Sequence, residues 1–225
     1  ELSLATLLSG VWLVPVNTHL QTDEVAYIVE DSGARFVLTD AEHRATVEAL
    51  PSSPPIVEVG SQLDDLAAAA RSEPLGFDQP AGGRMHYTSG TTGRPKGVKR
   101  DLPPTAGAYL ELLSKLGVGV GLDGSGPHLL TGPHYHAAVG GYALFDLCNG
   151  APVVSMPRFD AAGLLQRVEE HRIAHMHVVP TMMVRLLRLP DDVRAAFDPS
   201  SLTHVLHGAA PITPASLPSV AGSSG

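Results

Sequence analysis

Short apolar segments alternate with amphipathic segments along most of the chain, and this alternation constrains the fold more than any other feature of the sequence. A parallel pair of strands needs a long crossover, which is usually a helix, so such an alternation predicts parallel sheets covered by helices. The sequence therefore predicts an α/β fold. We expect strands at 11–16, 35–38, 56–59, 85–87, 129–130, 152–156, 175–179 and 203–207, and helices at about 22–33, 40–50, 63–71, 106–116, 137–147, 161–171 and 182–189.

The composition is that of a folded protein with its own core. Of 225 residues, 44% are hydrophobic and 17% are charged, which excludes a disordered chain. The longest uncharged run, 129–145, contains His134 and His136, so we expect no integral membrane segment. No internal repeat is visible, which argues against a solenoid.

Charge and cysteine content narrow the class of protein further. The net charge of −8 argues against a nucleic-acid partner, because nucleic-acid-binding proteins present a broad basic face. Cys148, in an apolar neighbourhood, is interpreted as a small buried hydrophobic residue. A single cysteine excludes an internal disulfide framework and suits a reducing compartment, so we expect a cytoplasmic protein.

Two subdomains are expected, with a boundary in a glycine-rich stretch. Residues 117–126 read GVGVGLDGSG, which is the composition of a linker. We therefore predict one α/β subdomain at 1–120 and a second at 121–225. The chain starts at Glu1 without an initiator Met and ends in SVAGSSG, so we expect it to be a piece of a longer protein.

The most distinctive segment is YTSGTTGRPKG at 87–97, directly after a predicted strand. Each residue type in it suits a phosphate cradle: glycine lets backbone N–H groups approach an anion, hydroxyls donate hydrogen bonds, and lysine supplies a positive charge. The spacing differs from the Walker A pattern, because, counting from Gly90, Arg94 takes the last variable position and Pro95 stands where that pattern needs its second glycine. The sequence predicts an anion-binding loop outside the P-loop class.

The local charge agrees with an anionic ligand. Between Arg84 and Arg100 there are five cations and no acid, in a chain that is acidic overall. The alternative is an ordinary flexible loop with solvated charges. The density of hydroxyls, glycines and lysine after a strand favours a polyanionic ligand instead.

This segment resembles the phosphate-binding signature of the adenylate-forming superfamily, which includes acyl-CoA synthetases, aryl-CoA ligases, beetle luciferases and peptide-synthetase adenylation domains. The resemblance implies that a carboxylate attacks the α-phosphate of ATP to give an acyl-adenylate and pyrophosphate, after which a thiol, usually CoA, displaces AMP. The fold it implies is an incomplete large N-terminal domain of such an enzyme. The implied ATP contacts are Thr88, Ser89, Gly90, Thr91, Thr92, Gly93 and Lys96, and we expect Thr88 and Lys96 to act in catalysis.

Further motifs of the family follow in the expected order. GPHYHAAVGGYALF at 132–145 matches an acyl-pocket motif, in which His136 is the implied catalytic histidine at the pocket mouth. In APVVSMPRFD, Arg158 falls where some relatives hold a cation near the CoA phosphates, and a solvated turn cation is the alternative. HVLHGAAPI resembles the adenine-binding turn, whose small residues let a flat purine approach the backbone. Its implied contacts are Gly208, Ala209, Ala210 and Pro211.

Three histidines, His171, His175 and His177, allow a weaker alternative. His175 and His177 share one face of a predicted strand, but no carboxylate or cysteine joins them in sequence, so we predict no metal site there. Met182 and Met183 resemble wall residues of the acyl tunnel, although methionines at such spacing are more often plain core.

The chain departs from the family after the GAAP turn. The family continues with an acid that holds magnesium, an aspartate for the ribose, and a C-terminal domain with the adenylation lysine; none of these follows here. We therefore expect ATP, Mg²⁺ and CoA to be the partners of the whole enzyme, and the chain alone to turn over little. The predicted function is a fatty-acyl-CoA synthetase fragment in lipid metabolism. Alternatives are an aryl-acid CoA ligase, an adenylation domain, or a nucleotide-binding module without catalysis.

Overall fold

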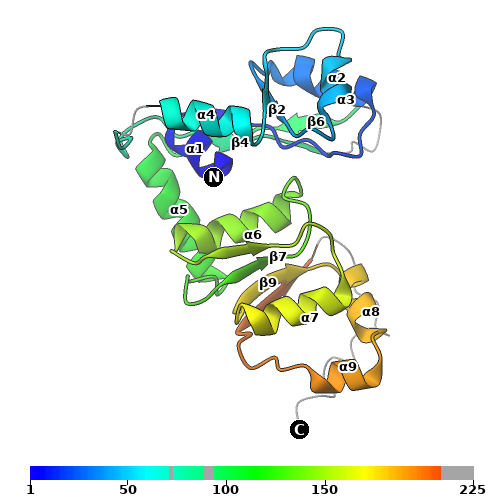
Figure 1. Ribbon diagram of the computed structural model, residues 1–225. Coiled ribbons are helices and arrows are strands. Elements are labelled where there is room, and N and C mark those ends of the chain that lie inside the picture. The colour runs from blue at the N-terminus through cyan, green and yellow to red at the C-terminus, as the bar shows by residue number, and fades with distance from the viewer. Residues whose placement is uncertain (71–72, 89–93, 209–225) are drawn as a thin grey trace. The chain divides into compact units, whose positions relative to one another are not determined.

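The computed structural model describes residues 1–70, 73–88 and 94–208, whose path Figure 1 shows. The chain forms two compact units, Glu1–Tyr109 and Leu110–Gly225. The division falls within helix α5 (Ala106–Gly119). The boundary after residue 120 that the sequence suggests stays a prediction.

Strands and helices alternate over most of the N-terminal unit, as the sequence predicts, and the unit ends in consecutive strands. Its elements are α1 (Leu2–Leu8), β1 (Trp12–Leu13), α2 (Thr22–Ser32), β2 (Val37–Thr39), α3 (Arg44–Glu48), β3 (Ile56–Glu58), α4 (Ser61–Ala69), β4 (Gly83–Arg84), β5 (His86–Thr88) and β6 (Lys96–Val98). Among the described residues, β1 pairs with β4 and β2 with β3, both in parallel, whereas β5 and β6 pair in antiparallel. Strands β4 and β6 were not predicted, because glycine and lysine have low β-propensity.

Helix α2 is defined at both ends by local chemistry and anchored by its apolar face. Gln21 and Glu24 form a capping box at its start, and Gly33, with φ 63°, takes the left-handed conformation at its end. One face buries Val25, Ile28 and Val29, and of these Val25 and Val29 join Val47 and Leu50 in a small core. Two anchored ends and a buried face make α2 a fixed support for the side chains on its other face.

The C-terminal unit is built on one parallel sheet. Its elements are β7 (His128–Leu130), α6 (Ala137–Cys148), β8 (Val153–Ser155), α7 (Ala161–Glu170), β9 (His175–Val178), α8 (Pro180–Leu187), α9 (Asp191–Ala196) and β10 (His204–His207). The strand order is β10-β9-β7-β8, with every pair parallel. The sequence predicts these elements except the short helix α9.

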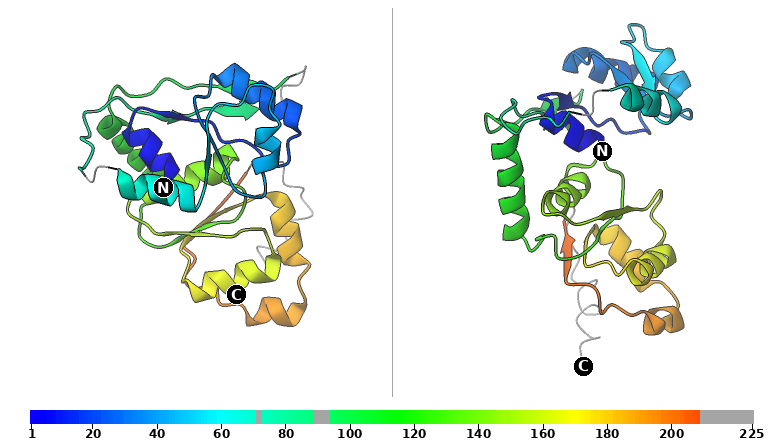
Figure 2. Two further views of the ribbon diagram at one scale, coloured as in Figure 1. Left: turned by 45° about the horizontal axis from the view of Figure 1, so that its top comes forward. Right: turned by 60° about the vertical axis from the view of Figure 1, so that its left-hand side comes forward.

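Helices cover both faces of this sheet (Figure 1, Figure 2). On one face, Leu129, Met176 and Val178 pack with Leu164 and Val168 of α7 in a fully apolar core. The predicted wall residues, Met182 and Met183 of α8, also pack against this core. On the other face, α6 lies over β7 and β9 and meets a layer of buried polar side chains. One face of the sheet therefore buries apolar side chains, whereas the other buries polar ones.

The glycine-rich stretch 117–126 is packed into the C-terminal unit. Leu122 is fully buried, and the side-chain amide of Asn149 donates a hydrogen bond of 2.9 Å to its carbonyl oxygen. Gly124, at φ 80°, lies so close to the Asn149 carbonyl that a Cβ atom would fall 2.0 Å from its oxygen. Four of the glycines here, Gly117, Gly121, Gly124 and Gly126, serve close packing, because a Cβ atom on each would fall within 3.0 Å of a neighbouring atom. In the described part of the chain, no helix has both the length and the apolar character to cross a membrane.

Candidate functional site

The β5–β6 hairpin carries the two ends of the predicted phosphate-binding loop. Thr88 at the end of β5 pairs directly with Lys96 at the start of β6. Directly opposed residues of an antiparallel pair lie on the same face, with Cβ atoms about 5 Å apart. Both residues are exposed, so a hydroxyl and an ammonium group share one open surface. The other predicted loop contacts, Ser89, Gly90, Thr91, Thr92 and Gly93, lie outside the described residues.

The opposite face of the hairpin is packed. Tyr87 pairs with Gly97, and a Cβ atom on Gly97 would fall 2.1 Å from Met85 Cε and 3.0 Å from Tyr87 Cζ. Gly97 therefore leaves room for the side chains of Met85 and Tyr87. From the sequence, this glycine was grouped with the residues that let an anion approach, whereas the structure explains it by packing. Because side chains alternate along a strand, a packed Tyr87 turns Thr88 and Lys96 to the open face.

The cations around the loop fall into different environments. The Arg94 guanidinium lies over the Tyr27 ring, with Cζ 5.0 Å from the ring centroid, and Lys99 Nζ lies 4.3 Å from the Trp12 centroid. Arg84 is half-buried, and burial lowers the pKa of its guanidinium. Lys96 is an exposed cation that faces the same way as Thr88.

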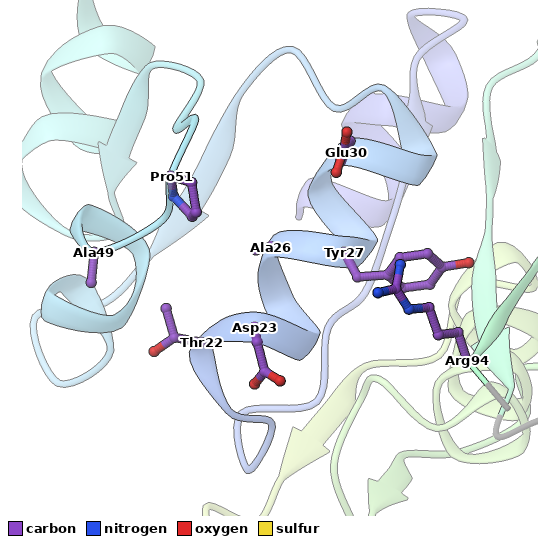
Figure 3. A pocket seen from close by; sticks show the side chains of 8 residues that line it. All are labelled: Thr22, Asp23, Ala26, Tyr27, Glu30, Ala49, Pro51 and Arg94. Carbon is purple, nitrogen blue, oxygen red and sulfur yellow. The ribbon is translucent and has the colours of Figure 1, made fainter.

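An open groove of about 370 Å³ lies beside α2 in the same unit (Figure 3). Asp23 and Glu30 line it from α2, Ala49 and Pro51 line it from the segment after α3, and Arg94 closes one end. Two carboxylates give this groove the wrong charge for a phosphate. The Thr88–Lys96 face of the hairpin is therefore the better candidate for an anion.

The C-terminal unit carries its own group of predicted site residues, at the carboxyl edge of its sheet. The strand order reverses between β7 and β9, and in open parallel sheets ligands bind outside the carboxyl ends of the strands at such a point. Thr131, just after β7, donates a hydrogen bond to the carbonyl of His177 in β9 and joins the two ends. Gly208 follows β10 at this edge, and Arg158 is exposed after β8. The remaining residues of the predicted adenine turn, Ala209, Ala210 and Pro211, lie outside the described residues.

His136 is the N-cap residue of α6, on the segment that follows β7. Its side chain is exposed, and the centroid of its ring lies 4.6 Å from the centroid of the Tyr135 ring. Parallel strands place their carboxyl ends along one edge, so the topology brings His136 and Gly208 to the same edge of the sheet. Their roles toward a ligand stay predictions.

A buried polar cluster under α6 was not predicted. Asp146 of α6 is fully buried and accepts hydrogen bonds from His128 Nδ1 at 2.7 Å and from His175 Nδ1 at 2.9 Å. Gly124 N–H also donates to it, at 3.3 Å. In the sequence His175 has no carboxylate nearby, because its partner lies 29 residues away along the chain. The signal available in the sequence was Asp146 itself, an acidic residue in the otherwise apolar segment that forms α6.

The three histidines considered as a metal site do not come together as such a site. His171 is exposed at the end of α7, whereas His175 and His177 are buried in β9. Among the described residues, no group of three or more histidine, cysteine, aspartate or glutamate side chains could hold a metal ion. Cys148 at the end of α6 is half-buried, and burial raises the pKa of its thiol to about 11, so this cysteine is protonated at neutral pH.

His177 is buried, and neither of its ring nitrogens has a hydrogen-bond partner among the described residues. The centroid of its ring lies 5.1 Å from that of Tyr142. Burial, aided by His128 and His207, lowers the pKa of His177 below its ordinary value. As the pH falls through about 6.5, the unfolded chain takes up a proton at this residue and the folded chain does not. The stability that neutral His177 contributes is therefore present above this pH and is lost as the pH falls toward the folded pKa.

We expect His177→Phe to make the loss of stability on acidification shallower, because phenylalanine fills the same place beside Tyr142 and takes up no proton. The free energy of unfolding is measured by urea denaturation at several pH values from about 7.5 to about 5. The matched control, His171→Gln, changes an exposed histidine of the same unit. Equal pH dependence of the wild-type chain and His177→Phe would contradict the assignment.

The chain is therefore an α/β protein with a candidate anion-binding hairpin. Its parallel sheet has a second candidate binding position at the carboxyl ends of the strands. A family model described as "AMP-binding enzyme" matches residues 1–221. The chain therefore belongs to the AMP-binding enzyme family, and its resemblance to the adenylate-forming acyl-CoA synthetases is confirmed.

The related proteins are CoA ligases of several kinds. The chain is 30% identical to the long-chain-fatty-acid–CoA ligase FadD13 of Mycobacterium tuberculosis, over 90% of this chain and 41% of that protein. It is 33% identical to a feruloyl-CoA synthase of Amycolatopsis sp., over 94% of this chain and 41% of that protein. The chain thus spans about 41% of the length of these relatives.

Solved structures show the same fold. The N-terminal domain of FACL13 from Mycobacterium tuberculosis superposes with a TM-score of 0.76 at 25% identity, covering 94% of this chain and 54% of that one. The o-succinylbenzoate CoA synthetase MenE of Bacillus subtilis, solved with ATP and magnesium, gives a TM-score of 0.68 at 29% identity, covering 90% of this chain and 40% of that one. The fold is therefore that of an N-terminal domain of an adenylate-forming enzyme.

Proposed function

We propose that the chain is the ATP-binding part of an acyl-CoA ligase that activates a fatty acid as acyl-AMP and transfers the acyl group to CoA. The observation that carries this proposal is the exposed cross-strand pair Thr88 and Lys96, which flanks the Gly- and Thr-rich segment 89–93 in a chain of this family. A hydroxyl donor opposite an ammonium group suits phosphate oxygens.

The other site residues are assigned the roles that the resemblance to the family implies. Lys96 stabilises negative charge on the phosphates during attack by the carboxylate, and Thr88 donates a hydrogen bond beside it. The segment 208–211 contacts the adenine, His136 lies at the mouth of the acyl pocket, and Arg158 contacts the CoA phosphates. No step is assigned to magnesium: among the described residues, no group of three or more histidine, cysteine, aspartate or glutamate side chains could hold it.

The acid is proposed to be a fatty acid, and an aryl acid is the second candidate. FadD13 acts on long-chain fatty acids and supports the first, whereas the feruloyl-CoA synthase supports the second. The start of α6 reads AAVGG, and this run of small side chains leaves room for a long or bulky acyl group. An adenylation domain or a module that binds nucleotide without catalysis would use the same hairpin.

We expect the full-length protein to release pyrophosphate from ATP when a fatty acid is supplied, and to form the corresponding acyl-CoA when CoA is added. A panel of fatty acids of graded length, with ferulate and benzoate, identifies the acid class by pyrophosphate release and by mass spectrometry of the products. Highest kcat/KM with ferulate or benzoate would select the aryl-acid candidate. ATP binding without turnover of any acid would select the non-catalytic module. Absence of ATP binding would overturn all three.

A further inference from the structure

We propose that helix α2 positions the phosphate-binding hairpin, with Tyr27 and Asp31 as positioning residues for ATP. This inference rests on the proposed function, because it assigns to α2 the orientation of the Thr88–Lys96 face. Neither residue belongs to a recognisable sequence motif. Tyr27 and Asp31 stand four residues apart on α2, so their side chains lie on the same face of the helix.

The strand that enters the loop is held by Asp31. The Tyr87 hydroxyl donates a hydrogen bond of 2.6 Å to Asp31 Oδ2, which joins residues 56 positions apart in the chain. Burial and this carboxylate raise the pKa of the Tyr87 phenol, so it stays a donor at any physiological pH. The Tyr27 ring adds an edge-to-face contact with the Tyr87 ring, at 6.4 Å between centroids and 86° between planes.

The segment that leaves the loop is held by Tyr27. The guanidinium of Arg94 faces the Tyr27 ring at 5.0 Å from its centroid, as Figure 3 shows. Tyr87 and Arg94 lie on either side of residues 89–93, so one face of α2 contacts both flanks of the loop. Tyr27 takes part in both contacts.

These contacts determine which way the ligand face points. With Tyr87 held against α2 and fitted over Gly97, the alternation of side chains turns Thr88 and Lys96 away from α2. The buried side of α2 and its two caps keep the helix in place. Without this support Thr88 and Lys96 are chemically intact but less well oriented, and small misplacements of binding groups are costly in catalysis.

The test compares paired variants in the full-length protein. Tyr27→Leu and Asp31→Ala are expected to raise the Kd and the KM for ATP by about three- to tenfold, the size of effect that one weak interaction accounts for. The KM for the acid is expected to stay unchanged. Tyr27→Phe keeps the ring and loses only the 3.5 Å hydrogen bond that the Tyr27 hydroxyl donates to Asp31 Oδ1, so it should restore most of the wild-type affinity. Asp64→Ala, an exposed acid on α4, is the matched control and should leave ATP affinity unchanged.

A double-mutant cycle isolates the hydrogen bond itself. Tyr87→Phe removes only the hydroxyl, so Tyr87→Phe combined with Asp31→Ala should weaken ATP binding no more than Asp31→Ala alone. Thermal unfolding of each variant separates orientation from stability, because a merely structural role lowers Tm and raises the KM for ATP and acid together.

The possible outcomes distinguish a failure of the proposed ATP-binding function from a failure of the positioning role of α2. If Lys96→Ala leaves ATP affinity unchanged, or the wild-type protein does not bind ATP, the proposed function is wrong and the inference falls with it. If Lys96→Ala weakens ATP binding while Tyr27→Leu and Asp31→Ala match the Asp64→Ala control, only the positioning role is overturned. Equal rises in the KM for ATP and acid with a fall in Tm would also overturn it.

Discussion

Lys96→Ala is expected to weaken ATP binding by about 10- to 100-fold, which corresponds to the loss of a hydrogen bond between charged groups. Lys96 is exposed and lies opposite Thr88, so its ammonium group and the Thr88 hydroxyl can meet the same phosphate. Arg94 and Lys99 do not replace it, because both are engaged with aromatic rings. Calorimetric titration of the full-length protein with ATP measures the effect.

Two variants give this prediction its controls. Lys96→Arg keeps the charge and is expected to retain part of the affinity, although a guanidinium binds phosphate with a different geometry. Lys115→Ala removes another exposed lysine, one that pairs with Glu111 at 2.6 Å on α5, and should leave ATP affinity unchanged. The same ATP affinity in Lys96→Ala and Lys115→Ala would show that the hairpin is not the phosphate site.

Asp146→Ala is expected to lower the free energy of unfolding by about 3–5 kcal/mol, a large share of the stability of an ordinary domain. Its carboxylate is fully buried and is the acceptor for both His128 Nδ1 and His175 Nδ1. Its removal leaves two buried imidazoles without that acceptor, and buried polar groups without partners are costly. Urea denaturation of the chain, followed by circular dichroism, measures the change.

Two further variants serve as controls for the Asp146→Ala prediction. Asp192→Ala removes an exposed carboxylate of α9 and should change the free energy of unfolding by no more than about 0.5 kcal/mol. Asp146→Asn keeps the shape and one acceptor oxygen, so it should cost less than Asp146→Ala. A loss below about 1 kcal/mol for Asp146→Ala would mean that the cluster does not organise the unit.

Most of the secondary structure could be predicted because it depends on local patterns. The helix at α2 has its polar start and Gly33 stop in sequence, and β7, β8, β9 and β10 are short apolar runs between breakers. Strand β6 escaped prediction because a Lys-Gly-Val segment has no strand signal of its own. It becomes a strand by pairing with β5, which is a tertiary circumstance.

The candidate site was predicted in part for the same reason. The loop at 87–97 was recognisable because its glycines, hydroxyls and lysine are contiguous in sequence. Its support by α2 was not, because Asp31 and Tyr87 are far apart in the chain and each is an ordinary residue in its own segment. The partnership of Asp146 with His128 and His175 was hidden in the same way.

The sequence by itself determined most of the helices and strands, where the cationic Gly- and Thr-rich loop lies, and the order of the family motifs. These properties depend on residues that are neighbours in the chain. Only the tertiary structure decided that Lys96 faces the same way as Thr88, that Gly97 makes room for Tyr87, and that Asp146 joins two buried histidines. Those relations are set by strand register and by the packing of distant segments, which local propensity does not encode.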